Sequence, residues 1–190
     1  MDGWGEGAVI AALAGSLREK SVNRGLIRAA CELLPAGVRV ENLPLGELPH
    51  YNMDLEVAEP DAVRTFKARL RSARAILIAT PEFNGSVPGV LKNALDWASR
   101  PAGKSPMAAK PTAIMGAGGR GGTAQAQGHL REVLARLGVP VLPGPVVQVA
   151  NSWQKFDADG NLVDGASRAL LRELLDALLS AAGVPTRVGA

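Results

Sequence analysis

The chain has 190 residues, of which 47% are hydrophobic and 21% charged, a balance that excludes a disordered body and fits one domain with a sizeable core. Its 21 basic and 18 acidic residues give a formal net charge of +3, and the basic residues are scattered along the chain, so no nucleic-acid partner is expected. A single cysteine excludes an intramolecular disulfide and structural zinc, and the first apolar run ends at Gly15, too short for insertion into a membrane, so we expect a cytoplasmic protein.

The first half of the chain alternates strand and helix patterns. Residues 8–14 form a short apolar run closed by a glycine, which is typical of a strand buried on both faces. Helical spacing follows over residues 24–34 and includes Cys31, predicted to be a core residue, and residues 38–42 then read as a strand. After a loop rich in proline and glycine, Asp61 is predicted to cap the next helix.

The second half continues the alternation and is predicted to end in a long helix. In chain order the predicted elements are a strand at 75–79, a helix at 90–99, a strand at 112–115, a helix ending at Gly138, an interrupted strand over 139–141 and 146–149, and a helix at 166–181. Trp97 lies in the predicted helix at 90–99, where either a core or a subunit-interface position fits an aromatic side chain.

Five alternations of strand and helix predict a parallel sheet with helices on both faces. We expect one domain over residues 1–190, with flexible termini at about 1–7 and 183–190. Ligands of such sheets bind at the carboxyl ends of the strands, where the winding reverses. Three loops, after the first, third and fourth strands, have the small and polar residues that a closely bound ligand requires.

The first loop, residues 15–23, has the composition of a phosphate site. Ser16, Ser21 and Asn23 offer neutral donors and Arg18 a charged fork, directly before a helix whose N-terminal amides favour anions. The spacing of a Walker loop is absent. The alternative is an ordinary polar turn in which a serine or asparagine caps the helix.

The second loop, residues 80–89, is suited to the edge of a flat ring. Two prolines fix the backbone, two glycines allow close approach, and Asn84 and Ser86 offer polar contacts. The alternative is that Pro88 merely starts the next helix and that Glu82 is a solvated charge.

The third loop is the glycine cluster of residues 116–122. Gly116, Gly118 and Gly121 match the spacing of the dinucleotide fingerprint G-x-G-x-x-G, but no acidic residue follows about 20 positions later to hold a ribose. A flat backbone surface beside a ligand held by the other loops, a Rossmann-type NAD site and a turn without contacts remain three alternatives.

The residues of the first two loops resemble a known family. The string Gly15-Ser16-Leu17-Arg18 with Ser21 and Asn23, followed by the run from Pro81 to Trp97 (PEFNGSVPGVLKNALDW), resembles the NADPH-dependent FMN reductases, which include quinone, chromate and azo-compound reductases. The similarity extends in order from about Ala8 to Leu179.

This resemblance implies an α/β, flavodoxin-like three-layer sandwich with a five-stranded parallel sheet of order 2-1-3-4-5 that holds FMN without a covalent bond. It implies that the FMN phosphate contacts Ser16, Arg18, Ser21 and Asn23, and that the flavin ring contacts Pro81, Glu82, Phe83, Asn84 and Ser86. It also places the third loop, with Gly116, Gly118, Gly119 and Arg120, beside the ring. Two departures from the family pattern are Phe83, where a tyrosine is common, and the dense glycine run around Arg120.

The implied activity is hydride transfer from NADPH or NADH through FMN to a small-molecule acceptor such as a quinone, with donor and acceptor using one pocket in turn. No side-chain acid or base and no metal is required. The resemblance further implies a homodimer or homotetramer. The alternative is a flavodoxin-like carrier or regulatory binder without NAD(P)H turnover, against which the positive net charge counts.

Overall fold

The computed structural model describes residues 7–185. Residues 1–6 and 186–190, which belong to the termini expected to be flexible, lie outside the described residues. The strands are β1 (Ala8–Ala14), β2 (Val38–Leu43), β3 (Ala75–Ala79), β4 (Thr112–Ala117) and β5 (Val147–Val149). The α-helices are α1 (Val22–Leu33), α2 (Asp61–Ser72), α3 (Gly89–Ala98), α4 (Ala124–Arg136) and α5 (Gly165–Ala181). Short 3₁₀ turns are η1 (Leu45–Glu47), η2 (Met53–Glu56) and η3 (Ser152–Gln154).

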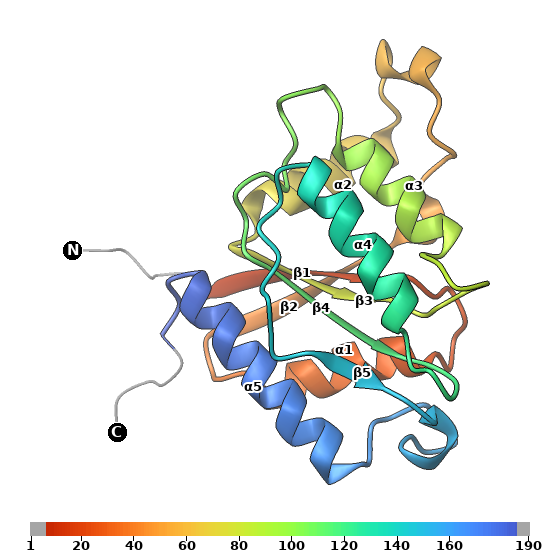
Figure 1. Cartoon of the computed structure of the whole chain (residues 1–190). Helices are drawn as coiled ribbons and strands as arrows, with labels where there is room; N and C mark the ends of the chain where they lie inside the picture. The colour runs from red at the N-terminus through yellow and green to blue at the C-terminus, as the bar shows by residue number, and fades with distance from the viewer. Residues whose placement is uncertain (1–6, 186–190) are drawn as a thin grey trace.

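All strand pairs of the described sheet are parallel, in the order β2-β1-β3-β4-β5. Helices α1 and α5 cover one face, and α2, α3 and α4 cover the other (Figure 1). The flavodoxin-like order and the three layers are therefore confirmed. The winding reverses between β1 and β3, so the loops after these two strands meet at the carboxyl edge of the sheet.

The central strands are apolar because both of their faces are buried. Every residue of β3 is buried, and alternate side chains of β1 enter different layers: Ile10 packs under α1 and α5, whereas Leu13 packs under α2 and α3. A continuous apolar run is thus the sequence expected for a strand with helices on each side, and it explains why β1 and β3 have the predicted bounds.

Three predictions about individual positions were wrong. Cys31 is exposed, because α1 buries Leu26, Ile27 and Ala30, and the next residue along the helix falls on its outer surface. Asp61 is the first residue of α2 and makes no capping bond; Pro60 occupies the N-cap position. The interrupted fifth strand is reduced to Val147–Val149, since Val141 forms only an isolated bridge with Thr112 before the prolines break the ladder.

Trp97 belongs to the core, with no exposed surface, and holds the segment between β2 and α2. Its indole Nε1 donates to the Pro49 carbonyl oxygen at 2.8 Å, and Asn93 Oδ1 accepts from the Tyr51 amide at 2.7 Å. The ammonium group of buried Lys67 lies over the indole ring, 5.8 Å from its centroid. Asn93 and Trp97, one turn apart on α3, therefore hold the loop that follows β2 in place through these hydrogen bonds.

Candidate functional site

A cavity of about 390 Å³ lies where the three predicted loops converge. Its lining consists of Ser16, Arg18, Ser21, Val22, Asn23, Pro81, Glu82, Phe83, Ala117, Gly118, Gly119 and Ser152. The first loop follows β1, the second follows β3 and the third follows β4, and each contributes residues to the lining. The cavity therefore lies at the switch point, the place between β1 and β3 where the winding of the sheet reverses. The volume is in the range of small-molecule and cofactor sites.

The first loop presents unpaired donors to this cavity. Ser21 caps α1, with its hydroxyl oxygen accepting from the Asn23 amide at 3.2 Å. The Ser16 hydroxyl and the Arg18 guanidinium make no hydrogen bond or ion pair with other described residues, and Arg18 is exposed. A free hydroxyl, a free guanidinium and a helix N-terminus together form a donor set suited to a phosphate group.

Asn23 is buried and performs a different task from the other predicted phosphate ligands. Its Nδ2 donates to the Ala117 carbonyl oxygen and its Oδ1 accepts from the Ala117 amide, both at 2.9 Å. This pair of bonds joins the start of α1 to the end of β4. The side chain thereby sets the distance between the first and third loops.

The second loop forms a tight turn that carries Phe83 outward. Asn84 (φ 50°) and Gly85 (φ 71°) occupy the two central positions, and Phe83 and Ser86 exchange both backbone hydrogen bonds, at 3.1 and 3.0 Å. These dihedrals are those of a type I′ turn, which favours Asn-Gly. Phe83 is consequently 55% exposed at the mouth of the cavity.

Glu82 links the second loop to the helix that follows the third. Its Oε2 accepts from the Ala126 amide at 3.0 Å, in the first turn of α4. Thr123, at the N-cap position of α4, makes no capping bond, since its hydroxyl accepts from the Gln127 side-chain amide at 3.0 Å. Glu82 therefore is not a solvated charge but supplies the cap from another loop.

The predicted residues Asn84, Ser86, Gly116 and Arg120 do not line the cavity. Ser86 Oγ lies 3.1 Å from His129 Nδ1 on α4, and Arg120 is exposed in the third loop. Gly116 lies inside β4, where an added Cβ would come within 2.4 Å of the Thr80 carbonyl oxygen, so this glycine serves close packing. A fingerprint glycine belongs in a loop, and this position therefore disfavours the Rossmann alternative.

Ser152 is a cavity residue that sequence reasoning did not identify. It follows β5, and its amide donates to the Gly118 carbonyl oxygen at 3.0 Å, while the neighbouring Asn151 amide donates to Gly119 at 2.9 Å. The third loop is thus fixed by the segment after the fifth strand. The available signal was its place after the predicted fifth strand, at the carboxyl edge of the sheet.

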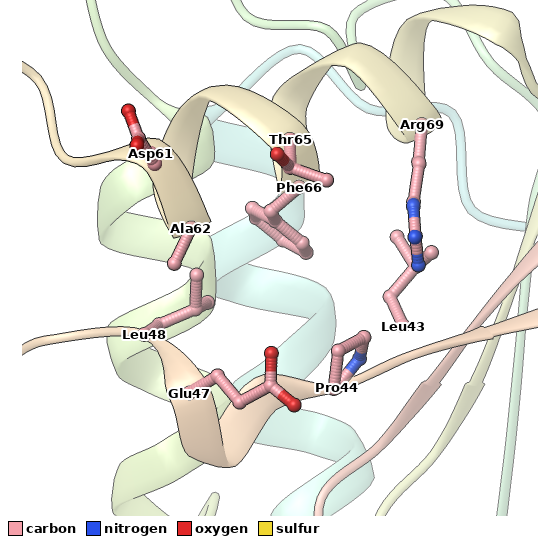
Figure 2. Close-up of a pocket in the computed structure, with 9 residues that line it drawn as sticks. All are labelled: Leu43, Pro44, Glu47, Leu48, Asp61, Ala62, Thr65, Phe66 and Arg69. Atoms are coloured by element: carbon pink, nitrogen blue, oxygen red, sulfur yellow. The ribbon is translucent and has the colours of Figure 1, made fainter.

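A smaller cavity lies between η1 and α2, as Figure 2 shows, with the Phe66 side chain of α2 directed toward Leu48 and Pro44. Its volume is about 160 Å³, and it shares no lining residue with the cavity at the switch point. This volume is below the range of drug-sized ligand sites. The cavity at the sheet edge, where the three loops converge, is the candidate cofactor site.

Within the described residues 7–185, no helix combines the length and the apolar character needed to cross a membrane. The same range contains no group of three or more histidine, cysteine, aspartate or glutamate side chains that could hold a metal ion.

Comparisons with known proteins agree with this geometry. The family described as NADPH-dependent FMN reductase matches residues 9–154. An NAD(P)H-dependent FMN reductase from Pseudomonas aeruginosa is 45% identical over 168 residues, covering 87% of this chain and 90% of that protein. A 2-hydroxy-1,4-benzoquinone reductase from a Burkholderia species is 42% identical over 168 residues, covering 88% of this chain and 92% of that protein.

Solved structures place the fold with the same group. FerB, a flavoenzyme NAD(P)H:(acceptor) oxidoreductase from Paracoccus denitrificans, superposes with a TM-score of 0.83 at 33% identity, covering 93% of this chain and 97% of that one. Sequence, fold and the position of the cavity lead to one assignment: the chain belongs to the NADPH-dependent FMN reductase family.

Proposed function

We propose that this protein is an NAD(P)H-dependent flavoprotein reductase that holds FMN in the cavity at the switch point and delivers reducing equivalents to quinones or similar small acceptors. The observation that carries the proposal is the convergence of a free guanidinium, a free hydroxyl and a helix N-terminus on one cavity. The family assignment and the activities named for its quinone-reducing relatives support it.

The residues of the cavity fit FMN in two parts. Ser16, Arg18 and the N-terminus of α1 would hold the phosphate, because they combine positive charge with unpaired donors. Pro81 and Phe83 would contact the ring on one side, and Gly118 and Gly119 would flank it with backbone. Asn84, Ser86, Gly116 and Arg120 would act from outside this lining.

FMN, when bound, supplies the redox chemistry by accepting a hydride from the nicotinamide and passing it on. The chain itself contributes binding and orientation. Its third loop would direct backbone amides toward the negative charge of the reduced cofactor. Phe83, exposed at the cavity mouth, would offer an apolar contact to a flat donor or acceptor. No side chain of this chain is assigned as acid or base.

We further infer a homodimer or homotetramer located in the cytoplasm. Support comes from the resemblance to the reductase family and from the presence of one unpaired cysteine, which is typical of a reducing compartment.

The decisive experiment is the visible spectrum of the purified protein, followed by heat release and identification of the chromophore and by anaerobic addition of NADPH. We expect bound FMN that bleaches on addition of NADPH. Bound FMN that NADPH and NADH cannot reduce would instead favour a carrier or regulatory binder. A colourless protein that does not take up added FMN would refute the proposal.

A further inference from the structure

A further cavity of about 390 Å³ is lined by residues of α1, of the end of the edge strand β2 and of the first loop. Its lining is Glu19, Arg24, Ile27, Arg28, Cys31 and Asn42. Residues 24, 27, 28 and 31 are spaced three and four apart and therefore form one face of α1, while Asn42 comes from the end of the edge strand β2. None of these residues lines the proposed flavin cavity.

The Arg24 side chain has no hydrogen-bond or ion-pair partner in the described part of the chain. Its Nε is buried without a hydrogen bond, and its guanidinium takes part in no ion pair. Arg24 also lies in the first turn of α1, a turn that contains no acidic residue, so its positive charge adds to the positive end of the helix dipole. A buried cationic nitrogen in such a place is stabilised by an anion.

Arg28, one turn further along, is anchored by hydrogen bonds and interacts electrostatically with the Asp157 carboxylate. Its Nε donates to Asn161 Oδ1 at 2.8 Å, and its Nη2 donates to the carbonyl oxygens of Asp159 and Gly160 at 3.1 and 2.9 Å. All three acceptors are uncharged, and Nη1 is left without a hydrogen bond to any described residue. These bonds fix the guanidinium in place and leave Nη1 to donate to a ligand.

The other residues that line this cavity limit the polarity and charge of a ligand that fits it. Ile27 and the Cys31 side chain provide apolar contact, and partial burial raises the pKa of the Cys31 thiol, so this wall is uncharged at neutral pH. Asn42 offers an amide at the end of β2. Glu19 is the one carboxylate in the lining; it is exposed and pairs with neither arginine in the described structure.

We propose that the Arg24–Arg28 cavity binds a phosphate monoester whose uncharged organic part packs against Ile27 and Cys31. The Arg24 guanidinium and the remaining Nη1 of Arg28 supply N–H donors from two positively charged groups, which suits a phosphate dianion better than a single carboxylate. The phosphate has two chemical sources: the 2′-phosphate of NADPH or a free phosphorylated metabolite. Binding of the phosphate itself is independent of the flavin cavity, with which this site shares no lining residue, whereas NADPH as its source rests on the proposed function.

Binding is tested by calorimetric titration of the FMN-saturated protein with adenosine 2′-monophosphate, so that the flavin cavity is already filled. We expect saturable binding that weakens about tenfold or more in Arg24→Ala and tightens in Glu19→Gln, which removes the repelling carboxylate. Arg172→Ala, which deletes the same charge from an exposed position on α5, is the matched control and leaves the affinity unchanged. Absence of saturable binding, or equal affinity in the Arg24 variant, would overturn the proposal.

Cys31 provides a second measurement that does not depend on activity. It is the only cysteine of the chain, so labelling with N-ethylmaleimide adds one group that mass spectrometry can follow. Adenosine 2′-monophosphate is expected to slow labelling several-fold in the unmodified protein and not in Arg24→Ala. Equal labelling rates with and without the nucleotide would contradict the assigned location.

Steady-state kinetics separate the two sources. A KM for NADPH that rises in Arg24→Ala while the KM for NADH stays constant identifies the dinucleotide as the source. Unchanged KM values for both, together with lost binding of the monophosphate, identify a free phosphate monoester. Failure of the proposed reductase function would be visible separately, as absence of bound FMN or of its reduction.

Discussion

Arg18 and Asn23 lie in the same short loop and do different work. The Arg18 side chain is exposed and makes no hydrogen bond or ion pair with the residues that the structure describes, so its charge is available to a ligand. Asn23 is buried, and both ends of its amide bind the backbone of Ala117. The proposed role of Arg18 is therefore in ligand affinity and that of Asn23 is in the shape of the site, although both are polar residues of one loop.

Replacing Arg18 by alanine is expected to weaken FMN binding about tenfold or more, because charge-assisted hydrogen bonds to phosphate are lost. Arg18→Lys keeps the positive charge but not the two-pronged guanidinium. Its affinity for FMN should lie between those of the unmodified protein and of Arg18→Ala. Quenching of flavin fluorescence on titration of the apoprotein measures the affinities, with Arg172→Ala as the charge-matched control. An unchanged affinity in Arg18→Ala would remove Arg18 from the phosphate site.

Replacing Asn23 by alanine is expected to lower the free energy of unfolding by about 1–3 kcal/mol, because the buried amide and carbonyl of Ala117 lose their partner. Urea unfolding of the apoprotein measures this loss in the absence of any ligand. Asn23→Asp keeps the acceptor but turns a carboxylate toward the Ala117 carbonyl oxygen, and it should also destabilise. A fully stable Asn23→Ala variant would contradict the role as a link between loops.

At the scale of elements, carboxylates bind free backbone amides in the first turns of two helices. The first turn of α4 is capped by Glu82 from the second loop, and α5 is capped by Asp164, whose carboxylate accepts from the Ser167 amide at 2.8 Å. Each carboxylate satisfies amides that have no partner within their own helix, and each favours the positive end of the helix dipole.

Glu82→Ala is expected to lower the free energy of unfolding by about 1 kcal/mol, the usual cost of a lost helix cap. Glu82→Gln retains an oxygen acceptor for the Ala126 amide and should cost less. Urea unfolding of both variants compares them directly. Equal losses in the two would show that the charge, and not the hydrogen bond, matters at this position.

Asp164 gives α5 a stability that depends on pH. Hydrogen bonds from the Ser167 hydroxyl and amide lower the pKa of this carboxyl below its ordinary value of 3.8. The stabilisation is therefore complete above pH 3.8, the range in which the unfolded chain is also ionised, and it is lost as the pH falls through the lower pKa of the folded state. Asp164→Asn should flatten this part of the profile, as measured by urea unfolding between pH 2.5 and about 6. If Asp164→Asn lost stability at acid pH just as the unmodified protein does, the pH dependence would not come from Asp164.

At the scale of the whole molecule, the site exists only because distant segments meet at one sheet edge. The loops after β1, β3 and β4 and the segment after β5 all contribute to one cavity. A ligand that bridges them must stabilise the folded chain relative to the unfolded one, because the unfolded chain cannot assemble the four contributions.

FMN present at about 100 times its Kd is expected to raise the free energy of unfolding by about 2.7 kcal/mol, which corresponds to a Tm increase of about 5–10 °C for a chain of this size. Differential scanning calorimetry of the apoprotein with and without FMN measures the shift. Riboflavin, which lacks the phosphate, should give a smaller shift if the first loop binds that group. Equal shifts for the two ligands would argue against a phosphate site there.

The sequence by itself determined the order of strands and helices, the layered fold and the three loops around the cavity. These features depend on local patterns: apolar runs predict buried strands, helical spacing predicts the covering helices, and polar residues after strands mark the ligand edge. The bounds of β1 and β3 agree with prediction because glycine and the Thr-Pro pair end the two apolar runs sharply.

Only the tertiary structure decided what individual side chains do. The Asn23 amide is bound 94 positions away, at Ala117, and the Glu82 carboxylate caps a helix 44 positions away. The exposure of Cys31, the shortening of β5 and the unpaired Arg24 likewise depend on which segments pack against each other. Local periodicity predicts where an element lies, but the partner of a polar group is fixed by distances between segments that are far apart in the chain.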